Sequence, residues 1–309
     1  MIYIIGAGAV GKSLAVSLKL HQRDVTIIRG SVDQADRYVE RIEIWYNNQE
    51  ALVQEVEVST LNHHSELEGV VVLTNKSYGN DELARKLEGK TSSSPVVLLQ
   101  NGLGIEGPFW ERLFPEIYRG ILFLSGEKTV KGVNYTPVAD SPIGVVRSNN
   151  TQLDALVELL NTPYFEFRTE EFIEKIIWEK AIANTVFNSI CPLLDIDNGI
   201  FHRDPQVFGL ARKIIAQCIM VAHAEGISIN QEDMEARVLH ISKKSDGSLI
   251  STLQDMRNGR ETEIDTLNGA IVEVAQKYNQ EHVVEETKLL GELIRMKSQL
   301  MRKHNNQPS

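Results

Sequence analysis

Cysteine is scarce in this chain of 309 residues, which contains only Cys191 and Cys218. Neither belongs to a Cys-x-x-Cys pair or to a Cys/His cluster with metal-ligand spacing, so we expect no zinc site and assign no metal. Two isolated thiols fit a reducing compartment. The first residues, MIYII, already form a strand pattern without a basic leader, and we therefore expect a cytoplasmic protein.

Long apolar runs and excess positive charge are also lacking. We find no run approaching the roughly 20 apolar residues that span a bilayer, so no membrane partner is expected. The formal net charge is −10 and the sequence pI is about 5.4. An acidic surface repels phosphate backbones, so nucleic acid is not an expected partner either. A local basic pocket for a small anion remains compatible with this charge.

The first half of the chain alternates short apolar runs with helical patterns, whereas the pattern after about residue 168 is helical throughout. Runs that are apolar along their whole length, separated by helices, are typical of parallel strands buried on both faces of a sheet. We predict an α/β fold, with a Rossmann-type doubly wound parallel sheet in residues 1–168 and an all-α helical domain in residues 169–309. The expected strands are 2–5, 25–28, 70–74, 95–99 and 121–124, with antiparallel strands in 128–148 closing one edge. The expected helices are 172–194, 205–225, 231–240 and a tract from 261 to about 303.

The segment IYIIGAGAVGKSL places Gly6, Gly8 and Gly11 in the spacing GxGxxG, directly after a strand and at the start of a helix. In this context Gly6 permits a tight turn, Gly8 lets the backbone approach a pyrophosphate, and Gly11 lets the helix pack close to the sheet. The N–H groups at the helix start then bind the anion. The alternative is a glycine-rich turn without a ligand. The expected dinucleotide-binding residues are Gly6, Ala7, Gly8, Ala9, Val10 and Gly11.

The end of the second strand, VTIIRGS, lacks the acidic residue that accepts hydrogen bonds from the ribose of NAD. Arg29 stands there instead. A guanidinium fork matches a 2′-phosphate, so the sequence predicts NADP(H) over NAD(H). The alternative is a solvated loop arginine.

A line of polar residues runs through the apolar helix WEKAIANTVFNSICP. Lys180, Asn184 and Asn188 follow one another at intervals of four and therefore lie on one stripe of the helix. The bland interpretation is a solvated face. Asparagine is a mediocre helix former, however, and two of them in register with a lysine suit a stripe that faces a ligand cleft.

Four further polar residues stand at positions where ligands or helix ends are expected. Lys76 and Asn101 each follow a strand, and ligands bind at the carboxyl ends of strands in open α/β sheets, although turn chemistry is the alternative. Ser251 begins the polar segment STLQDMRNGRETEIDTLNG. Glu263 is expected to open the long final helix, where an acid commonly complements the helix dipole.

These segments together resemble the ketopantoate reductase (2-dehydropantoate 2-reductase) family over nearly the full length of the chain. The resemblance rests on IGAGAVG, NGLG, WEKAIANTVFNSICP and LQDMRNGRETEIDTLNG. The spacing K-x3-N-x3-N, followed by S-x-x-Q-D and T-E-I-D, is more specific to the family than the glycines alone. The resemblance implies a Rossmann domain followed by a helical domain, and NADPH-dependent reduction of 2-dehydropantoate to pantoate, a step towards pantothenate and coenzyme A.

The resemblance also implies roles for individual residues. Lys180 matches the catalytic lysine that donates a proton, and Glu263 matches an acid near the reaction centre. The implied substrate-binding residues are Asn101, Asn184, Asn188, Asn198 and Ser251. The implied cofactor-binding residues are the glycine loop, Arg29, Lys76, Asn101, Gly126 and Glu263.

Three segments depart from the family pattern. This chain reads TVKGVNYT where a proline-glycine and a histidine are frequent, VVEET where a Pro-x-Asn element is common, and SICP after Asn188 instead of an immediate proline. These departures leave the identity of the 2-oxo acid substrate open. A reductase of a related 2-oxo or 3-oxo acid and a non-catalytic NADP(H)-responsive binding protein are the alternatives.

All-α domains of this size often pair through an apolar face, which is compatible with a homodimer.

Overall fold

The computed structural model describes residues 1–47, 49–129, 132–148 and 152–305. It divides the chain into two compact units, of which the first comprises Met1–Gln100 and Ile105–Ile173. The second comprises Asn101–Gly104 and Glu174–Ser309. The expected division at residue 168 lies near the change of unit at Ile173. The sequence did not indicate that residues 101–104 belong to the second unit.

The first unit is built on one sheet, which in the described residues has 11 strands in the order β11-β10-β7-β6-β5-β1-β2-β4-β3-β9-β8. Its central part, β4-β2-β1-β5-β6-β7, is parallel. The chain winds outward from β1 in both directions, so the boundary between β1 and β5 is a topological switch point, where open α/β sheets bind ligands. The predicted doubly wound sheet is thereby confirmed. The central strands are β1 (Ile2–Ile5), β2 (Val25–Ile28), β4 (Glu50–Ser59), β5 (Val70–Leu73), β6 (Val96–Leu98) and β7 (Ile117–Gly120).

The strands of the sheet differ from the prediction in three respects. The sequence did not predict the long β3–β4 hairpin, in which β3 pairs antiparallel with β4. The strand expected at 121–124 is wrong, because β7 ends at Gly120 and β8 begins at Leu124. The strands expected in 128–148 go to both edges of the sheet, since β8 and β9 extend beyond β3 while β10 pairs antiparallel with β7. Residues 130 and 131 of that stretch lie outside the described part. The edge strands are β3 (Tyr38–Tyr46), β8 (Leu124–Thr129), β9 (Gly132–Pro137), β10 (Ser141–Arg147) and β11 (Phe167–Thr169).

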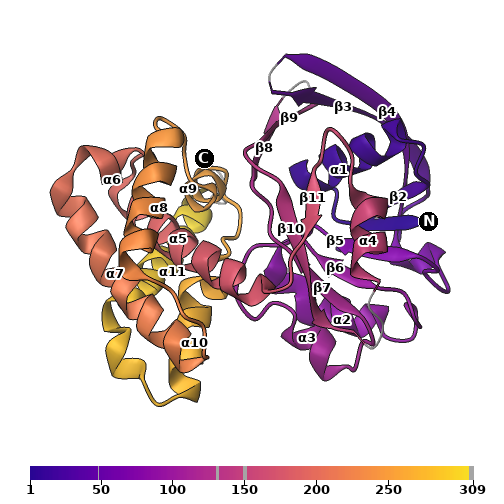
Figure 1. The fold of residues 1–309 in the computed structure, drawn as a ribbon. Helices are drawn as coiled ribbons and strands as arrows, with labels where there is room; N and C mark the ends of the chain where they lie inside the picture. The colour runs from indigo at the N-terminus through magenta and orange to yellow at the C-terminus, as the bar shows by residue number, and fades with distance from the viewer. Residues whose placement is uncertain (48, 130–131, 149–151, 306–309) are drawn as a thin grey trace. The chain divides into compact units, whose positions relative to one another are not determined.

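Helices cover both faces of the sheet (Figure 1). In β1, Ile2 and Ile4 pack in the core that contains α1, whereas Tyr3 and Ile5 pack in the core that contains α2 and α3. This alternation follows from the two-residue period of a strand. The side chains of a strand that is apolar at every position therefore pack alternately in the cores on the two faces of the sheet. The helices of this unit are α1 (Ala9–Leu20), α2 (Asn80–Leu87), α3 (Gly107–Glu111) and α4 (Leu153–Leu160).

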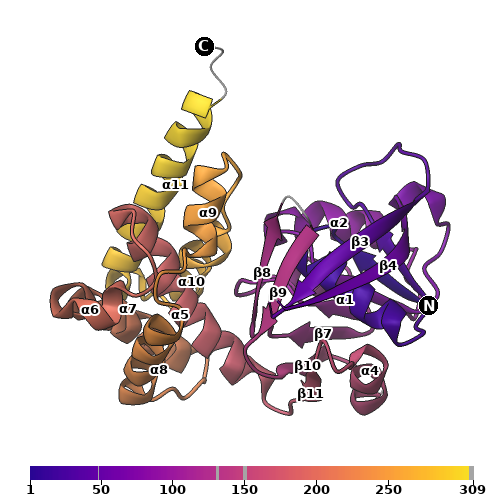
Figure 2. The ribbon, with the colours of Figure 1, turned by 90° about the horizontal axis from the view of Figure 1, so that it is seen from above.

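The described residues of the second unit form helices and turns without a strand, as predicted (Figure 2). Helix α5 contributes the most continuous buried segment, because nearly every residue from 181 to 192 is buried. The tract expected to form one long final helix is divided by turns into α10 and α11, preceded by the 3₁₀ turn η3 (Ile264–Thr266). The helices are α5 (Ile173–Leu194), α6 (Ile200–Arg203), α7 (Pro205–Ala224), α8 (Gln231–Lys244), α9 (Ser251–Arg257), α10 (Asn268–Lys277) and α11 (Glu285–Asn305).

Helix α7 corrects the expectation that no segment is long and apolar enough to span a membrane. Its 20 residues include a window of mean hydropathy 1.4, and 39% of that window is buried within the protein. Ile214, Ile215 and Cys218 of this helix pack in the core of the second unit. A core helix meets the same criteria of length and composition, so this helix is weak evidence for a membrane span.

Candidate active site

Two of the three fingerprint glycines are required by the packing of the protein itself. Gly6 has a φ of 125°, and a Cβ added there would lie 2.6 Å from the backbone nitrogen of Asn75. A Cβ added at Gly11 would overlap the carbonyl oxygen of Gly6. The hydroxyl of Thr74 donates to that same oxygen at 3.1 Å. The turn from β1 into α1 is therefore packed tightly against the end of β5.

Gly8 is different, because nothing in the protein requires a glycine there. Its φ of −81° is available to any residue, and an added Cβ would meet no atom within 4 Å. Gly8 precedes helix α1, whose first turn contains no acidic residue. Open space in front of backbone N–H groups at a helix start is the arrangement that accommodates a phosphate. The glycine loop thus fits a dinucleotide.

Strand β8 borders this loop. A Cβ added at Gly126 would lie 3.5 Å from the Cβ of Ala9, and Gly126 itself is exposed. The structure therefore places Gly126 next to the glycine loop. Lys12 of α1 forms an ion pair with Glu40, which ties the hairpin strand β3 to the helix.

Arg29 and Lys76 lie at the carboxyl ends of the two strands that flank β1. Arg29 follows β2, and its backbone N–H donates to the carbonyl oxygen of Ser59 at 2.9 Å. Its side chain is half-buried and makes no hydrogen bond or ion pair to another described residue. Lys76 follows β5 and precedes the 3₁₀ turn Ser77–Gly79. Because β2 and β5 both pair with β1, two cationic residues stand on either side of the glycine loop.

The side-chain amide of Asn75, which also follows the carboxyl end of β5, contains an acceptor without a hydrogen bond. Its Oδ1 is buried without a partner among the described residues, while its Nδ2 donates to the carbonyl oxygen of Lys76 at 3.0 Å. A buried polar atom without a hydrogen bond is costly, and a donor on a bound ligand removes that cost. Sequence reasoning did not single out Asn75, although it directly precedes Lys76.

In the second unit, Asn188 links the polar stripe of α5 to helix α9. Asn188 is 2% exposed, and its Nδ2 donates to the carbonyl oxygen of Asn184 at 3.0 Å. Its Oδ1 accepts hydrogen bonds from the hydroxyl of Ser251 and the backbone N–H of Thr252, both at 3.2 Å. Asn188 therefore satisfies a free N–H in the first turn of α9 and holds the Ser251 side chain. Towards the start of α5 the stripe becomes more exposed, since Asn184 and Lys180 are both half-buried.

Asn198 lies in a loop that an ionic network fixes. Arg203 makes two hydrogen bonds of 2.8 Å to the carboxylate of Asp197 and one of 2.8 Å to Asp246. The Arg203 guanidinium lowers the pKa of Asp197 to about 2. Asn198 itself is 7% exposed, its backbone N–H donates to Ser248, and its Oδ1 is buried without a partner among the described residues.

Glu263 and Asn101 belong to neighbouring segments of the second unit. Glu263 is buried and precedes η3, so it does not open a long helix as expected. Its carbonyl oxygen accepts hydrogen bonds from the N–H and the hydroxyl of Thr266. The backbone N–H of Leu103 donates to the carbonyl oxygen of Thr266 at 3.0 Å. The segment that carries Asn101 therefore lies against the turn that follows Glu263.

A buried amide pair in the first unit holds both ends of this segment. Asn80 and Gln100 exchange hydrogen bonds of 2.9 and 2.7 Å, and the Nδ2 of Asn80 also donates to the carbonyl oxygen of Ile105 at 3.0 Å. Sequence reasoning missed both residues. Only their proximity to Lys76 and Asn101 in the sequence offered a signal.

The described residues contain no group of three or more His, Cys, Asp or Glu side chains that could hold a metal ion. Cys191 and Cys218 are buried and unpaired, and burial raises the pKa of each thiol to about 12.

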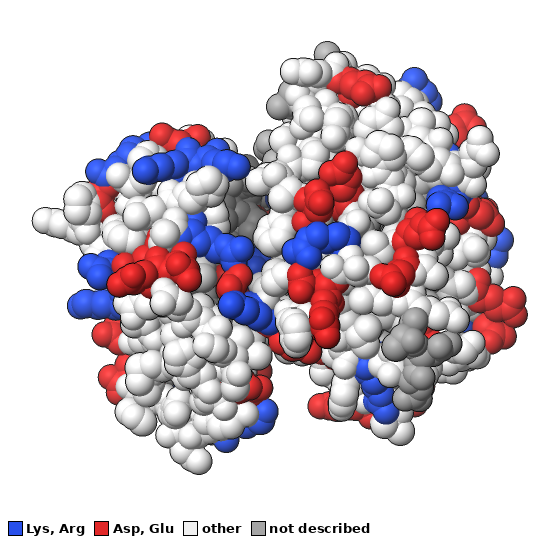
Figure 3. All heavy atoms as spheres, viewed as in Figure 1, with Lys and Arg blue, Asp and Glu red and all other residues white. Residues whose placement is uncertain are grey.

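On the face drawn in Figure 3, acidic and basic side chains are intermixed.

Comparisons with known proteins give the same family for both halves of the chain. Residues 2–139 match the family described as ketopantoate reductase PanE/ApbA, and residues 172–298 match its C-terminal domain. A 2-dehydropantoate 2-reductase of Pyrococcus horikoshii is 27% identical over 292 residues, which cover 91% of this chain and 92% of the relative. That of Halobacterium salinarum is 26% identical over 230 residues, covering 74% and 75%.

Solved structures share the fold at low sequence identity. A dimeric ketopantoate reductase from Staphylococcus aureus has a TM-score of 0.79 at 21% identity, covering 97% of this chain and 99% of its own. A D-mandelate dehydrogenase in a ternary structure with NADH and anilino(oxo)acetate has a TM-score of 0.81 at 21% identity, with the same coverage. The two family matches, which lie in different halves of the sequence, show that this chain belongs to the ketopantoate reductase family.

Proposed function

We propose that this protein is an NADPH-dependent reductase that converts 2-dehydropantoate to pantoate, within pantothenate and coenzyme A biosynthesis. The observation that carries the proposal is the contact between Asn188 and Ser251. It joins two motifs that are far apart in the sequence, both of which the family resemblance assigns to the substrate. The family membership and the named activity of the curated relatives support the same reaction.

The glycine loop and the two cationic residues on either side of it, Arg29 and Lys76, support NADP(H) as the cofactor. The pyrophosphate is proposed to lie against the open backbone of Gly8, and Arg29 is proposed to bind the 2′-phosphate. Lys76, Gly126 and the amide of Asn75 complete the cofactor site. When bound, the reduced nicotinamide supplies a hydride to the keto carbon. A structural neighbour is described with NADH, so the test must compare both cofactors.

Lys180 is proposed to act on the oxygen of the keto group. Its ammonium stabilises the negative charge that develops there and donates the proton that completes the hydroxyl. Asn184, Ser251 and Asn198 orient the substrate, while Asn188 holds Ser251 in place. Glu263 is proposed to act near the reaction centre, the role that the family resemblance implies for it. Asn101 lies with Glu263 in the second unit and is proposed to contact both cofactor and substrate.

We also propose where the protein is located and how it assembles. The isolated, reduced thiols support a cytoplasmic location. The description of the Staphylococcus aureus relative as dimeric supports a homodimer.

The test is NADPH oxidation on addition of 2-dehydropantoate, with NADH and other 2-oxo acids assayed in parallel. Lys180→Ala should lower kcat by about 100-fold or more, the usual scale for a positioned acid. Lys175→Ala, which removes an exposed lysine from the same helix, is the matched control. Arg29→Ala should raise the KM for NADPH without changing that for NADH.

Other outcomes would reassign the function. Turnover of a different oxo acid would retain the lysine mechanism and change the substrate; the D-mandelate dehydrogenase neighbour and the departures from the family pattern favour this as the second candidate. Tight NADPH binding without turnover of any acid would identify a binding protein. Unchanged kcat in Lys180→Ala would remove Lys180 from the mechanism.

A further inference from the structure

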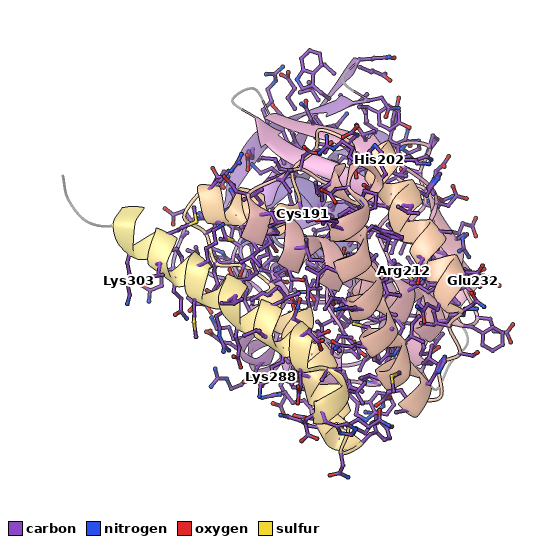
Figure 4. All side chains as sticks on the ribbon, turned by 90° about the vertical axis from the view of Figure 1, so that its left-hand side faces the viewer. Cys191, His202, Arg212, Glu232, Lys288 and Lys303 are labelled. Atoms are coloured by element: carbon purple, nitrogen blue, oxygen red, sulfur yellow. The ribbon has the colours of Figure 1, made fainter. Side chains whose placement is uncertain are left out.

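Helix α11 is attached to the second unit by one face only. Leu290, Ile294 and Ser298 on that face are buried. Gly291, also buried, lies so close to α10 that an added Cβ would be 2.8 Å from the Cβ of Asn268. Figure 4 shows the helix crossing the face turned towards the viewer, from near Lys288 to near Lys303.

A second apolar row lies on the outer side of the same helix. Its members are Leu289, Leu293, Met296 and Leu300, which are 55%, 39%, 54% and 60% exposed. Single exposed apolar residues are ordinary, but a continuous row of large ones marks an interaction surface. The spacing of four, three and four residues is the seam with which one α-helix packs along another. A second helix therefore fits this row.

The charge on α11 changes sign along its length. The first half carries three acidic side chains, Glu285, Glu286 and Glu292, and one basic side chain, Lys288. The second half carries four basic side chains, Arg295, Lys297, Arg302 and Lys303, and no acidic one. Asp265 and Glu261 lie 3.6 and 3.9 Å from Arg295 and Arg302, but these pairs are partly exposed and neutralise the basic end weakly.

This gradient selects the orientation of the partner helix. Two copies of α11 side by side in parallel would place basic half against basic half. Two antiparallel copies place each acidic half opposite a basic half. Complementary charge favours the antiparallel pair and disfavours the parallel one.

We propose that the row Leu289, Leu293, Met296 and Leu300 is the surface through which two copies of this protein associate, with their α11 helices antiparallel about a two-fold axis between residues 294 and 295. Such an interface is self-complementary. Leu289 of one copy faces Leu300 of the other, and Leu293 faces Met296. The proposal gives the homodimer proposed above a surface and an orientation, and it is independent of the reductase activity.

The first experiment measures association of the full-length protein by sedimentation equilibrium. The wild type should be a dimer, and Leu293→Glu should raise its dissociation constant by about tenfold or more, because a carboxylate is placed in an apolar contact. Gln299→Glu adds the same charge at a neighbouring exposed position outside the row and should leave the constant unchanged. A monomeric wild type, or a dimer that Leu293→Glu does not weaken, would overturn the proposal.

The second experiment tests the orientation by disulfide formation. The two native cysteines are buried, so a cysteine introduced in the row is the accessible thiol. Positions 289 and 300 are about 16 Å apart along the helix, too far for a disulfide, which needs Cα atoms within about 7 Å. In the antiparallel pair, Leu289→Cys and Leu300→Cys proteins cross-link when mixed, and neither cross-links alone. Efficient cross-linking of each variant with itself would show a parallel pair and overturn the proposed orientation.

Discussion

Gly8 and Gly11 belong to one loop, but they are glycines for different physical reasons. Gly11 makes room for the carbonyl oxygen of Gly6, whereas Gly8 faces open space. A methyl group at position 8 therefore disturbs only what binds there. A methyl group at position 11 disturbs the folded protein.

Gly8→Ala should leave the free energy of unfolding within about 0.5 kcal/mol of the wild type, as for other substitutions that meet no neighbour. It should raise the dissociation constant of NADPH by about tenfold or more, the scale of losing a hydrogen bond to a charged group. Gly11→Ala is the contrasting variant and should cost about 1–3 kcal/mol of stability through overpacking. Urea unfolding without cofactor and a fluorescence titration with NADPH measure the two effects. A destabilised Gly8→Ala protein would show that the space is not open.

At the level of single residues, the sequence predicted which polar residues share a helix, but it did not predict the contacts between distant segments. The four-residue spacing of Lys180, Asn184 and Asn188 placed them correctly on one helix, because helical periodicity is local information. The pairing of Asn188 with Thr252 joins residues 64 positions apart and leaves no local pattern. The same holds for the buried pair of Asn80 and Gln100.

Helix α9 begins without a side-chain cap from its own N-cap residue. The amide of Asn188 supplies the missing acceptor from α5 and at the same time fixes Ser251. A buried N–H that loses its partner costs about 1–3 kcal/mol. The start of α9 therefore depends on a side chain of another helix.

Asn188→Ala should accordingly lower the free energy of unfolding by about 1–3 kcal/mol. Asn184→Ala, one turn earlier on the same stripe, should change stability much less, because only its backbone carbonyl is used by Asn188. Chemical denaturation of both variants measures the difference. Equal stability of the two would mean that the Asn188 amide does not support α9.

The loop that carries Asn198 depends on the ion pair between Asp197 and Arg203. Asp197 has a pKa of about 2 instead of 3.8, mainly because of the Arg203 hydrogen bonds. A carboxyl whose pKa is lowered in the folded state stabilises that state above its ordinary pKa, and the contribution is lost as the pH falls from about 4 towards 2. The folded loop is therefore sensitive to acid in this range.

Arg203→Met removes the cation that lowers the pKa, so its stability should fall less steeply than that of the wild type between about pH 4 and pH 2. Arg257→Met, which removes an exposed guanidinium 3.0 Å from Asp195, is the control and should retain the steep decline. Unfolding free energies measured by urea titration at several pH values provide the comparison. Parallel curves for Arg203→Met and the wild type would contradict the assignment of the shift to this pair.

Among the elements, the sequence predicted the strands that are apolar at nearly every position. It misplaced or missed strands that contain charged residues. Strand β7 was displaced in the prediction because it contains Arg119, a fully buried guanidinium paired with Glu106. The hairpin strand β3 alternates buried Ile42 and Ile44 with polar residues, a two-residue period that the search for wholly apolar runs passed over. The division of the final helical tract depends on turns at residues 278–284, which lack glycine and proline.

For the whole molecule, the sequence predicted two units because the character of the pattern changes near residue 168. It could not predict that residues 101–104 leave the first unit and pack with the second. Leu103 supplies the packing, since it lies against the core of the second unit and its N–H donates to Thr266. That core consists largely of residues more than 70 positions later in the chain, so no local pattern reveals the contact.

Leu103→Ser should therefore destabilise the second unit although residue 103 lies within the sequence of the first. A partly buried leucine that is replaced by a small polar residue costs about 1–3 kcal/mol. Trp178 reports on the second unit alone, because the other two tryptophans, Trp45 and Trp110, belong to the first. In a Trp45→Phe/Trp110→Phe background, urea unfolding followed by fluorescence should shift to lower urea in Leu103→Ser. Leu113→Ser, which alters a leucine that is 72% exposed, should not shift it. If the Trp178 midpoint is the same in both variants, Leu103 does not contribute to the second core and residues 101–104 are only a loop of the first unit.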